Sequence, residues 1–288
     1  MGSISRGFRL ARASWSVVVQ DRQLLWLPIL SFLASLVVFA VFALGIYGIG
    51  LPESEEDIGV GFYLLGFVLY VALSFVTIFF NAAVIGAATE RLEGREASLS
   101  IGLGLARAHL GQIFVWAVIT ATIGMILRAI QERAGIFGRI VGGLLGIAWN
   151  AITFFVVPVV LYEPLSAPEA IKRSASLFRQ RWGEQFTGNV TIGLAIFLVA
   201  LAVGLPLVFV AAAAPIVGIP LLVVAVGLVA AAGAACSGVF NAALYRYATT
   251  GEGAGPFSRE DLDAAFKPKR GAVDTRPPMP PRPDPPLA

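Results

Sequence analysis

The 288 residues are strongly apolar: 57% are hydrophobic, only 14% are charged, and the mean hydropathy is +0.82. This composition excludes an ordinary soluble domain and is typical of an integral membrane protein. The net charge of +3 does not indicate a nucleic acid partner, because the basic residues surround apolar segments, where topology and attraction to anionic lipid explain them.

Six segments are long enough to cross a hydrocarbon core, which takes about 20 apolar residues. Four separate charge-free runs each match one span, and a fifth run, 185–245, is far too long for one. The turn APIVGIP at 214–220 divides that run, which favours two helices. We expect spans near 24–50, 60–88, 110–128, 139–162, 189–213 and 218–246.

The apolar runs are continuous and show no alternation of the kind that marks barrel strands. The predicted fold is therefore all-α: a polytopic membrane bundle of six transmembrane helices in three hairpins. The predicted membrane domain covers residues 1–250 and a tail covers 251–288. In the tail we expect a short helix near 258–266, followed by a proline-rich disordered end that could instead dock on another protein.

Lysine and arginine set the predicted orientation. With six spans, all but three of the 21 basic residues fall on the side of the two termini. The three exceptions, Arg128, Arg133 and Arg139, share one short loop. The positive-inside rule places both termini in the cytoplasm, and we predict a multi-pass protein of the plasma membrane.

An internal repeat organises the spans. Residues 10–13 and 105–108 both read LARA, and Arg173 lies 161 residues after Arg12 in a comparable stretch. Asn241 follows Asn81 by 160 residues, in FFNAAVIGAATERLEG at 79–94 and VFNAALYRYATTGEG at 239–253. We predict three units, each an amphipathic interfacial helix followed by a transmembrane hairpin.

The three predicted interfacial helices carry one apolar stripe each, with basic residues beside it. In the third, Ser166 and Glu169 have the spacing of a capping box. Such helices lie in the membrane interface, attracted by anionic headgroups. They are either simple connectors between the hairpins or a surface for a protein partner or a second copy of this chain. The candidate lipid contacts are Arg12, Trp15, Arg107, Lys172, Arg173 and Trp182.

Three asparagines lie inside the spans: Asn81, Asn150 and Asn241. An amide without a partner in hydrocarbon costs several kcal/mol, so each should face a neighbour. One interpretation is that Asn81 and Asn241 hold helices together, facing each other or symmetric partners through small-residue surfaces. The other is that the asparagines line a solute path. In the fourth span, Pro158 leaves a backbone carbonyl free one turn earlier, which predicts a kink.

No catalytic constellation is evident. His109 is the only histidine and lies at a membrane boundary, so histidine-based triads and metal sites are unavailable. Cys236 is the only cysteine and lies within a span. We predict a protein that is not an enzyme and needs no cofactor or metal.

Several motifs taken together resemble an uncharacterised group of prokaryotic six-helix membrane proteins, known only as a domain of unknown function. They are FFNAAVIGAATERLEG, WAVITATIGMILR, AWNAITFFVVPVVLYE and EAIKRSASLFRQRWGE, and the resemblance covers roughly residues 1–266. It implies a membrane protein and no activity. A more distant likeness is to the membrane domain of some glycerophosphodiester phosphodiesterases, whose soluble catalytic domain has no counterpart here.

The sequence therefore predicts a non-enzymatic membrane protein, an accessory or scaffold that binds lipid or a protein partner. The alternative is a transporter or channel for a small neutral or amphiphilic solute.

Overall fold

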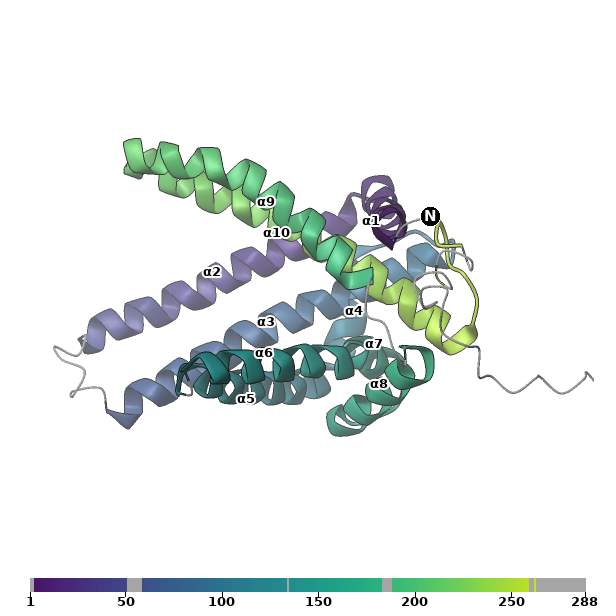
Figure 1. Ribbon diagram of the computed structural model, residues 1–288, viewed down its shortest axis with the longest axis horizontal. Coiled ribbons are helices and arrows are strands. Elements are labelled where there is room, and N and C mark those ends of the chain that lie inside the picture. Colours follow the sequence, from purple (N-terminus) through teal and green to yellow (C-terminus); the bar gives the residue numbers. More distant parts are fainter. Residues whose placement is uncertain (1–2, 51–58, 134, 183–187, 259–261, 263–288) are drawn as a thin grey trace, which may run out of the picture.

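The computed structural model describes residues 3–50, 59–133, 135–182, 188–258 and 262 (Figure 1). These residues form ten helices and no β-strand. The helices are α1 Ser3–Gln20, α2 Gln23–Ile49, α3 Val60–Leu92, α4 Leu99–Ala108, α5 Leu110–Arg133, α6 Gly135–Ile152, α7 Val156–Tyr162, α8 Ala167–Trp182, α9 Gly188–Ala213 and α10 Pro215–Thr250.

Six stretches of the described residues are long and apolar enough to cross a membrane, so the prediction of an all-helical multi-pass membrane protein is confirmed at that level. They are Gln23–Gly48, Val60–Leu92, Leu110–Glu132, Phe137–Tyr162, Ile196–Ala213 and Pro215–Thr250. The fourth consists of α6 and α7 with a short break between them. The predicted helix near 258–266 and the proline-rich end lie outside the described residues, except for Ser258 and Leu262.

Helices that follow one another in the chain pack together as α2 with α3, α5 with α6, and α9 with α10. A shorter helix, α1, α4 or α8, precedes each of these pairs. Helix α10 also packs along α3 and α2, and α3 packs on α4 and α5. Helix α3 therefore lies at the centre of the molecule, with contacts to every pair.

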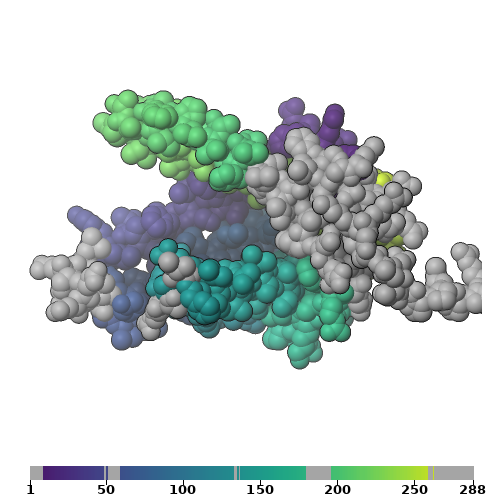
Figure 2. All heavy atoms as spheres, in the orientation of Figure 1, coloured from purple at the N-terminus to yellow at the C-terminus, as the bar shows by residue number. Residues whose placement is uncertain are grey.

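The buried core is concentrated at one end of the molecule, where α1, α4, α7 and α8 gather around residues 82–92 of α3 and 235–248 of α10 (Figure 1). We call this region the core end. At the opposite end the helix pairs separate, and α9 and α10 diverge from α2 (Figures 1 and 2). The side chains of α2 and α9 there are mainly exposed and apolar, as expected for surfaces that contact lipid.

Small residues set the helix spacing at the core end. A Cβ on Gly102 of α4 would lie 2.4 Å from the Ala83 carbonyl oxygen of α3, so only glycine fits there. A Cβ on Gly238 of α10 would lie 2.4 Å from the Val84 side chain. These contacts let backbones approach closely, which is how helices associate in membranes.

Candidate functional site

The fourth span is interrupted at residues 153–155, between the last residue of α6 and the first of α7. Pro158 lies in the first turn of α7 and has no backbone N–H. In a continuous helix, the N–H at position 158 would donate to the carbonyl of Phe154, four residues earlier. Around the break, three backbone groups take partners from elsewhere in the molecule: the Phe154 carbonyl, the Ile152 carbonyl and the Phe155 N–H.

Asn241 supplies the first partner. Its side-chain Nδ2 donates to the Phe154 carbonyl oxygen at 3.1 Å, replacing the bond that Pro158 cannot make. The Asn241 Oδ1 is buried and has no hydrogen-bond partner among the described residues. Only the nitrogen of the amide therefore makes a hydrogen bond, and this bond holds α10 against the break.

Ser174 of α8 supplies the other two partners. Its hydroxyl donates to the Ile152 carbonyl at 2.6 Å and accepts a bond from the Phe155 N–H at 3.0 Å. Ser174 is fully buried, one of two buried polar residues in the described chain; the other, Ser14, bonds only to Leu10 within its own helix. The Ser174 side chain therefore joins α8 to the backbone of the fourth span. Helices α6, α7, α8 and α10 meet at this break, and we call the meeting point the junction.

A charged contact lies at the end of α7. Arg173 Nε donates to both carboxylate oxygens of Glu163, at 3.1 and 2.9 Å, and the Tyr245 hydroxyl donates to Glu163 at 3.1 Å. Tyr245 stacks on Tyr162, with ring centroids 6.0 Å apart. Arg173, which the sequence suggests as a lipid contact, is thus paired with a carboxylate of the same end of the molecule.

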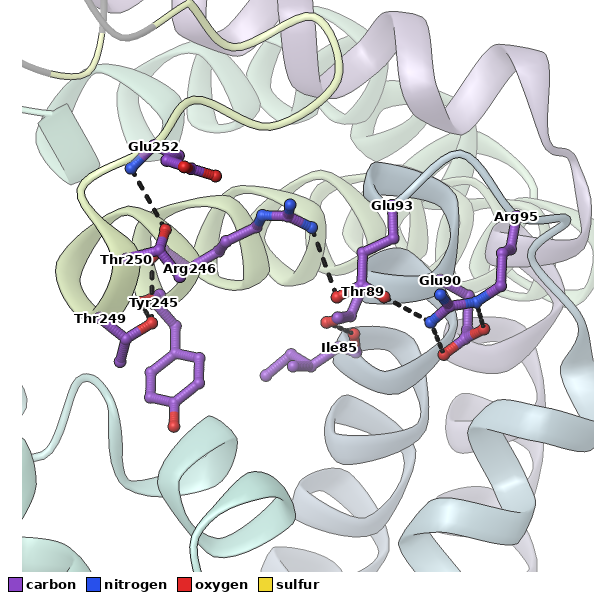
Figure 3. A network of polar contacts seen from close by, with 10 residues as sticks. All are labelled: Ile85, Thr89, Glu90, Glu93, Arg95, Tyr245, Arg246, Thr249, Thr250 and Glu252. Atoms are coloured by element: carbon purple, nitrogen blue, oxygen red, sulfur yellow. Dashed lines mark hydrogen bonds and ion pairs between the residues drawn. The ribbon is translucent and has the colours of Figure 1, made fainter. Parts of the chain in front are cut away.

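Figure 3 shows a second polar network, which links the ends of α3 and α10. Arg246 of α10 approaches Glu93 to 3.3 Å, and Glu93 also contacts Arg95. Arg95 Nε lies 2.5 Å from Glu90, and these hydrogen bonds to Glu90 and Glu93 raise the pKa of Arg95. The guanidinium Nε of Arg246 is buried with no hydrogen-bond partner among the described residues.

The start of α8 has the predicted contact between Ser166 and Glu169. The Glu169 carboxylate accepts from the Ser166 hydroxyl at 2.6 Å and from its N–H at 2.9 Å. These bonds, the hydroxyl first, lower the pKa of Glu169, because they stabilise its ionised carboxylate.

Asn81 and Asn150 lie apart from the junction at Phe154. Asn81 is half-buried and lines a cleft of about 240 Å³ between α2, α3 and α10, together with Ser31, Ser35 and Thr77. Asn150 is exposed on α6. The structure therefore brings the three asparagines to three different environments rather than to one shared cavity.

The predicted interfacial residues occupy the short helices of the core end. Arg12, Arg107 and Lys172 are exposed on α1, α4 and α8. Trp15 is 47% exposed on α1. Trp182 is the last residue of α8, and its side chain lies outside the described residues.

Ser174, Ser31 and Ser35 were not predicted as contacts from the sequence. One pattern also has a third copy that was not predicted: an aromatic residue, asparagine and alanine occur at 80–82, 149–151 and 240–242. This three-letter repeat could have linked Asn150 to the other two asparagines. Among the described residues, no group of three histidines, cysteines or carboxylates could hold a metal.

Residues 60–255 match a family described as a family of unknown function (DUF6159). The chain belongs to this family. The match includes the break at 153–155 and both of its partners, Ser174 and Asn241, so the junction lies within the DUF6159 region. Comparison of this DUF6159 chain with curated proteins and with solved structures gave no match. The likeness to the membrane domain of some glycerophosphodiester phosphodiesterases stays a prediction.

Proposed function

We propose that this chain is a non-enzymatic accessory or scaffold protein of the plasma membrane, which binds anionic lipid or a protein partner at its core end. The observation that carries the proposal is the use of Asn241 and Ser174 as internal partners for the broken fourth span. The Asn241 side-chain N–H that donates to Phe154 and the Ser174 hydroxyl are committed to backbone atoms, which makes them unavailable to a passing solute. They hold four helices in one arrangement, as a scaffold requires.

Charge supports a membrane-facing role for the core end. Arg12, Arg107 and Lys172 are exposed on three separate helices, and each precedes a pair of long apolar helices. In the proposed arrangement both termini are cytoplasmic, the six spans form three hairpins, and α1, α4 and α8 lie in the interface as amphipathic helices. Basic residues there are attracted to anionic headgroups by about 1 kcal/mol each.

The experiment compares lipid-dependent stability. The purified chain is placed in nanodiscs of zwitterionic lipid with and without anionic phosphatidylglycerol, and its thermal unfolding is followed by intrinsic fluorescence. The variant Arg12→Gln/Arg107→Gln/Lys172→Gln should lose most of the stabilisation that anionic lipid gives to the original chain.

The matched control is Arg128→Gln/Arg139→Gln, which removes two exposed charges from the opposite end of the spans. It should keep the effect of anionic lipid. Equal losses in both variants, or no effect of anionic lipid on the original chain, would contradict lipid binding at the core end. Reporter fusions after residue 258 and at residue 137 test the orientation separately.

A transporter or channel for a neutral or amphiphilic solute is the second candidate. The cleft beside Asn81 favours it, because this cleft places hydroxyl and amide groups between spans. A solute uptake assay with the original chain and Asn81→Leu in proteoliposomes separates the two. Uptake that depends on Asn81 in a normally inserted protein would contradict a purely scaffolding role.

A further inference from the structure

The cleft beside Asn81 has the features of a binding site within the bilayer. It lies between the first half of α2, the middle of α3 and the middle of α10, and is lined by Ser31, Ser35, Thr77 and Asn81. Asn81 precedes Glu90 by nine residues, roughly 13 Å along the helix. With Glu90 at the membrane boundary, this distance places Asn81 inside the hydrocarbon region, below the depth of phospholipid headgroups.

Of these four polar side chains, only Thr77 makes a hydrogen bond among the described residues. The Thr77 hydroxyl donates to the Leu73 carbonyl of its own helix. Among the described residues, no hydrogen bond is made by the side chains of Ser31, Ser35 or Asn81. An amide left unpaired in hydrocarbon costs several kcal/mol, so an occupant that both donates and accepts hydrogen bonds is favoured. None of the residues that line the cleft is charged, which favours a neutral occupant.

The remaining lining suits a hydrocarbon chain. Phe32, Phe80 and Val84 are apolar, and α10 contributes only small residues, with Ala230 and Ala234 exposed. The cleft lies where α9 and α10 begin to diverge from α2, and Figure 2 shows the space between them at the far end. In the proposed membrane arrangement, a gap between the spans α2 and α10 opens toward lipid, and an occupant would enter from there.

Size limits what the cleft encloses. Its volume of about 240 Å³ holds far more than one water molecule. It is nevertheless smaller than the roughly 300–1,000 Å³ of pockets that enclose a whole small molecule. It fits the polar end of a longer molecule whose chain remains between the helices and the surrounding lipid.

We propose that this cleft binds the hydroxyl end of a neutral lipid from the bilayer. Asn81, Ser31 and Ser35 exchange hydrogen bonds with the hydroxyl, and the apolar residues contact the first carbons of the chain. A long-chain alcohol and a diacylglycerol share this chemistry. The site is separate from the basic surface of the core end, so either can fail without the other.

The test uses the full chain in phosphatidylcholine nanodiscs with two photoreactive probes, a diazirine derivative of hexadecanol and one of diacylglycerol. Mass spectrometry locates the labelled peptides. We expect label on residues 23–37, 73–85 and 226–235, competed by unlabelled hexadecanol but not by its methyl ether. The probe that labels these peptides more strongly identifies the source of the hydroxyl.

Asn81→Leu and Ser31→Ala/Ser35→Ala should each weaken labelling about threefold to tenfold, as expected for lost hydrogen bonds. Ala234→Phe should abolish it by filling the cleft while leaving every polar group in place. Asn150→Leu is the matched control, since it removes an intramembrane asparagine elsewhere, and should label normally.

Thermal unfolding shows whether each variant is folded. If one of the three cleft variants does not fold, the other two still test the proposal. Any of three results would overturn the proposal. The alcohol and its ether compete equally, the label is unaffected by Asn81→Leu and by Ser31→Ala/Ser35→Ala, or no label appears in the three segments.

Discussion

Asn241 donates the hydrogen bond to the Phe154 carbonyl that Pro158 cannot donate. The proline and the asparagine lie on different helices, α7 and α10, and meet at a carbonyl that belongs to neither. This relationship explains how a broken helix is tolerated at membrane depth. Irregular backbone persists in a bilayer only where protein groups satisfy it.

The first prediction concerns the coupling of these two residues. Asn241→Leu should destabilise the protein by about 1–3 kcal/mol, because it removes the hydrogen bond that Asn241 Nδ2 donates to the Phe154 carbonyl at the break. In a Pro158→Ala background the helix can supply its own N–H, so the same substitution should cost clearly less. Thermal unfolding in detergent micelles measures both effects as a double-mutant cycle.

Asn150→Leu provides the control for this cycle, since its exposed side chain lies outside the junction. Its effect should be the same with and without Pro158→Ala. Strictly additive effects of Asn241→Leu and Pro158→Ala would show that the amide does not replace the missing N–H.

The second prediction compares the two buried serines. Ser174→Ala should cost about 1–3 kcal/mol, because two backbone groups at the break lose their common partner. Ser14→Ala should cost less than about 0.5 kcal/mol, because its hydroxyl bonds only to a carbonyl already used within the helix. Hydrogen exchange should also rise at Phe155 in the first variant. Equal stability losses would mean that burial, and not the bonds to the break, determines the cost.

The sequence could predict that one carbonyl loses its helical N–H donor, but not which group replaces that donor. Pro158 alone implies this loss at the carbonyl four residues earlier, whereas the approach of Asn241 depends on how α10 packs beside α7. The repeat illustrates the same limit. Asn81 and Asn241 have nearly identical neighbours in sequence, yet one lines a cleft and the other bonds to backbone. Local sequence sets the depth of a residue in the membrane, while tertiary packing decides which helix it faces.

The existence of six membrane-length segments was predictable for a simpler reason. Continuous apolar runs report length directly, and six stretches of the described residues are long and apolar enough to cross a membrane. Ser31 and Ser35 could not be recognised from sequence as part of a cleft. A serine in a span commonly bonds to its own helix, and only the divergence of α10 from α2 leaves these two beside open space.

The third prediction addresses the ion pair at the end of α7. Glu163 and Arg173 should couple by about 0.5–1 kcal/mol in a double-mutant cycle of Glu163→Gln and Arg173→Gln, because both side chains are partly exposed. High salt should reduce this coupling. Arg179→Gln, on an exposed position of the same helix, should show no coupling to Glu163→Gln. A coupling that salt leaves unchanged would indicate that packing, not charge, links the two residues.

The fourth prediction uses two glycines of α4 that differ only in their surroundings. Gly102→Ala should destabilise the protein by about 1–3 kcal/mol, because the added Cβ would lie 2.4 Å from the Ala83 carbonyl oxygen and must force α4 away from α3. Gly104 has open space around its Cβ position. Gly104→Ala should therefore stabilise the helix by up to about 1 kcal/mol, since alanine is the better helix former. Thermal unfolding of both variants tests the pair, and a similar effect of the two substitutions would contradict the close contact between α3 and α4.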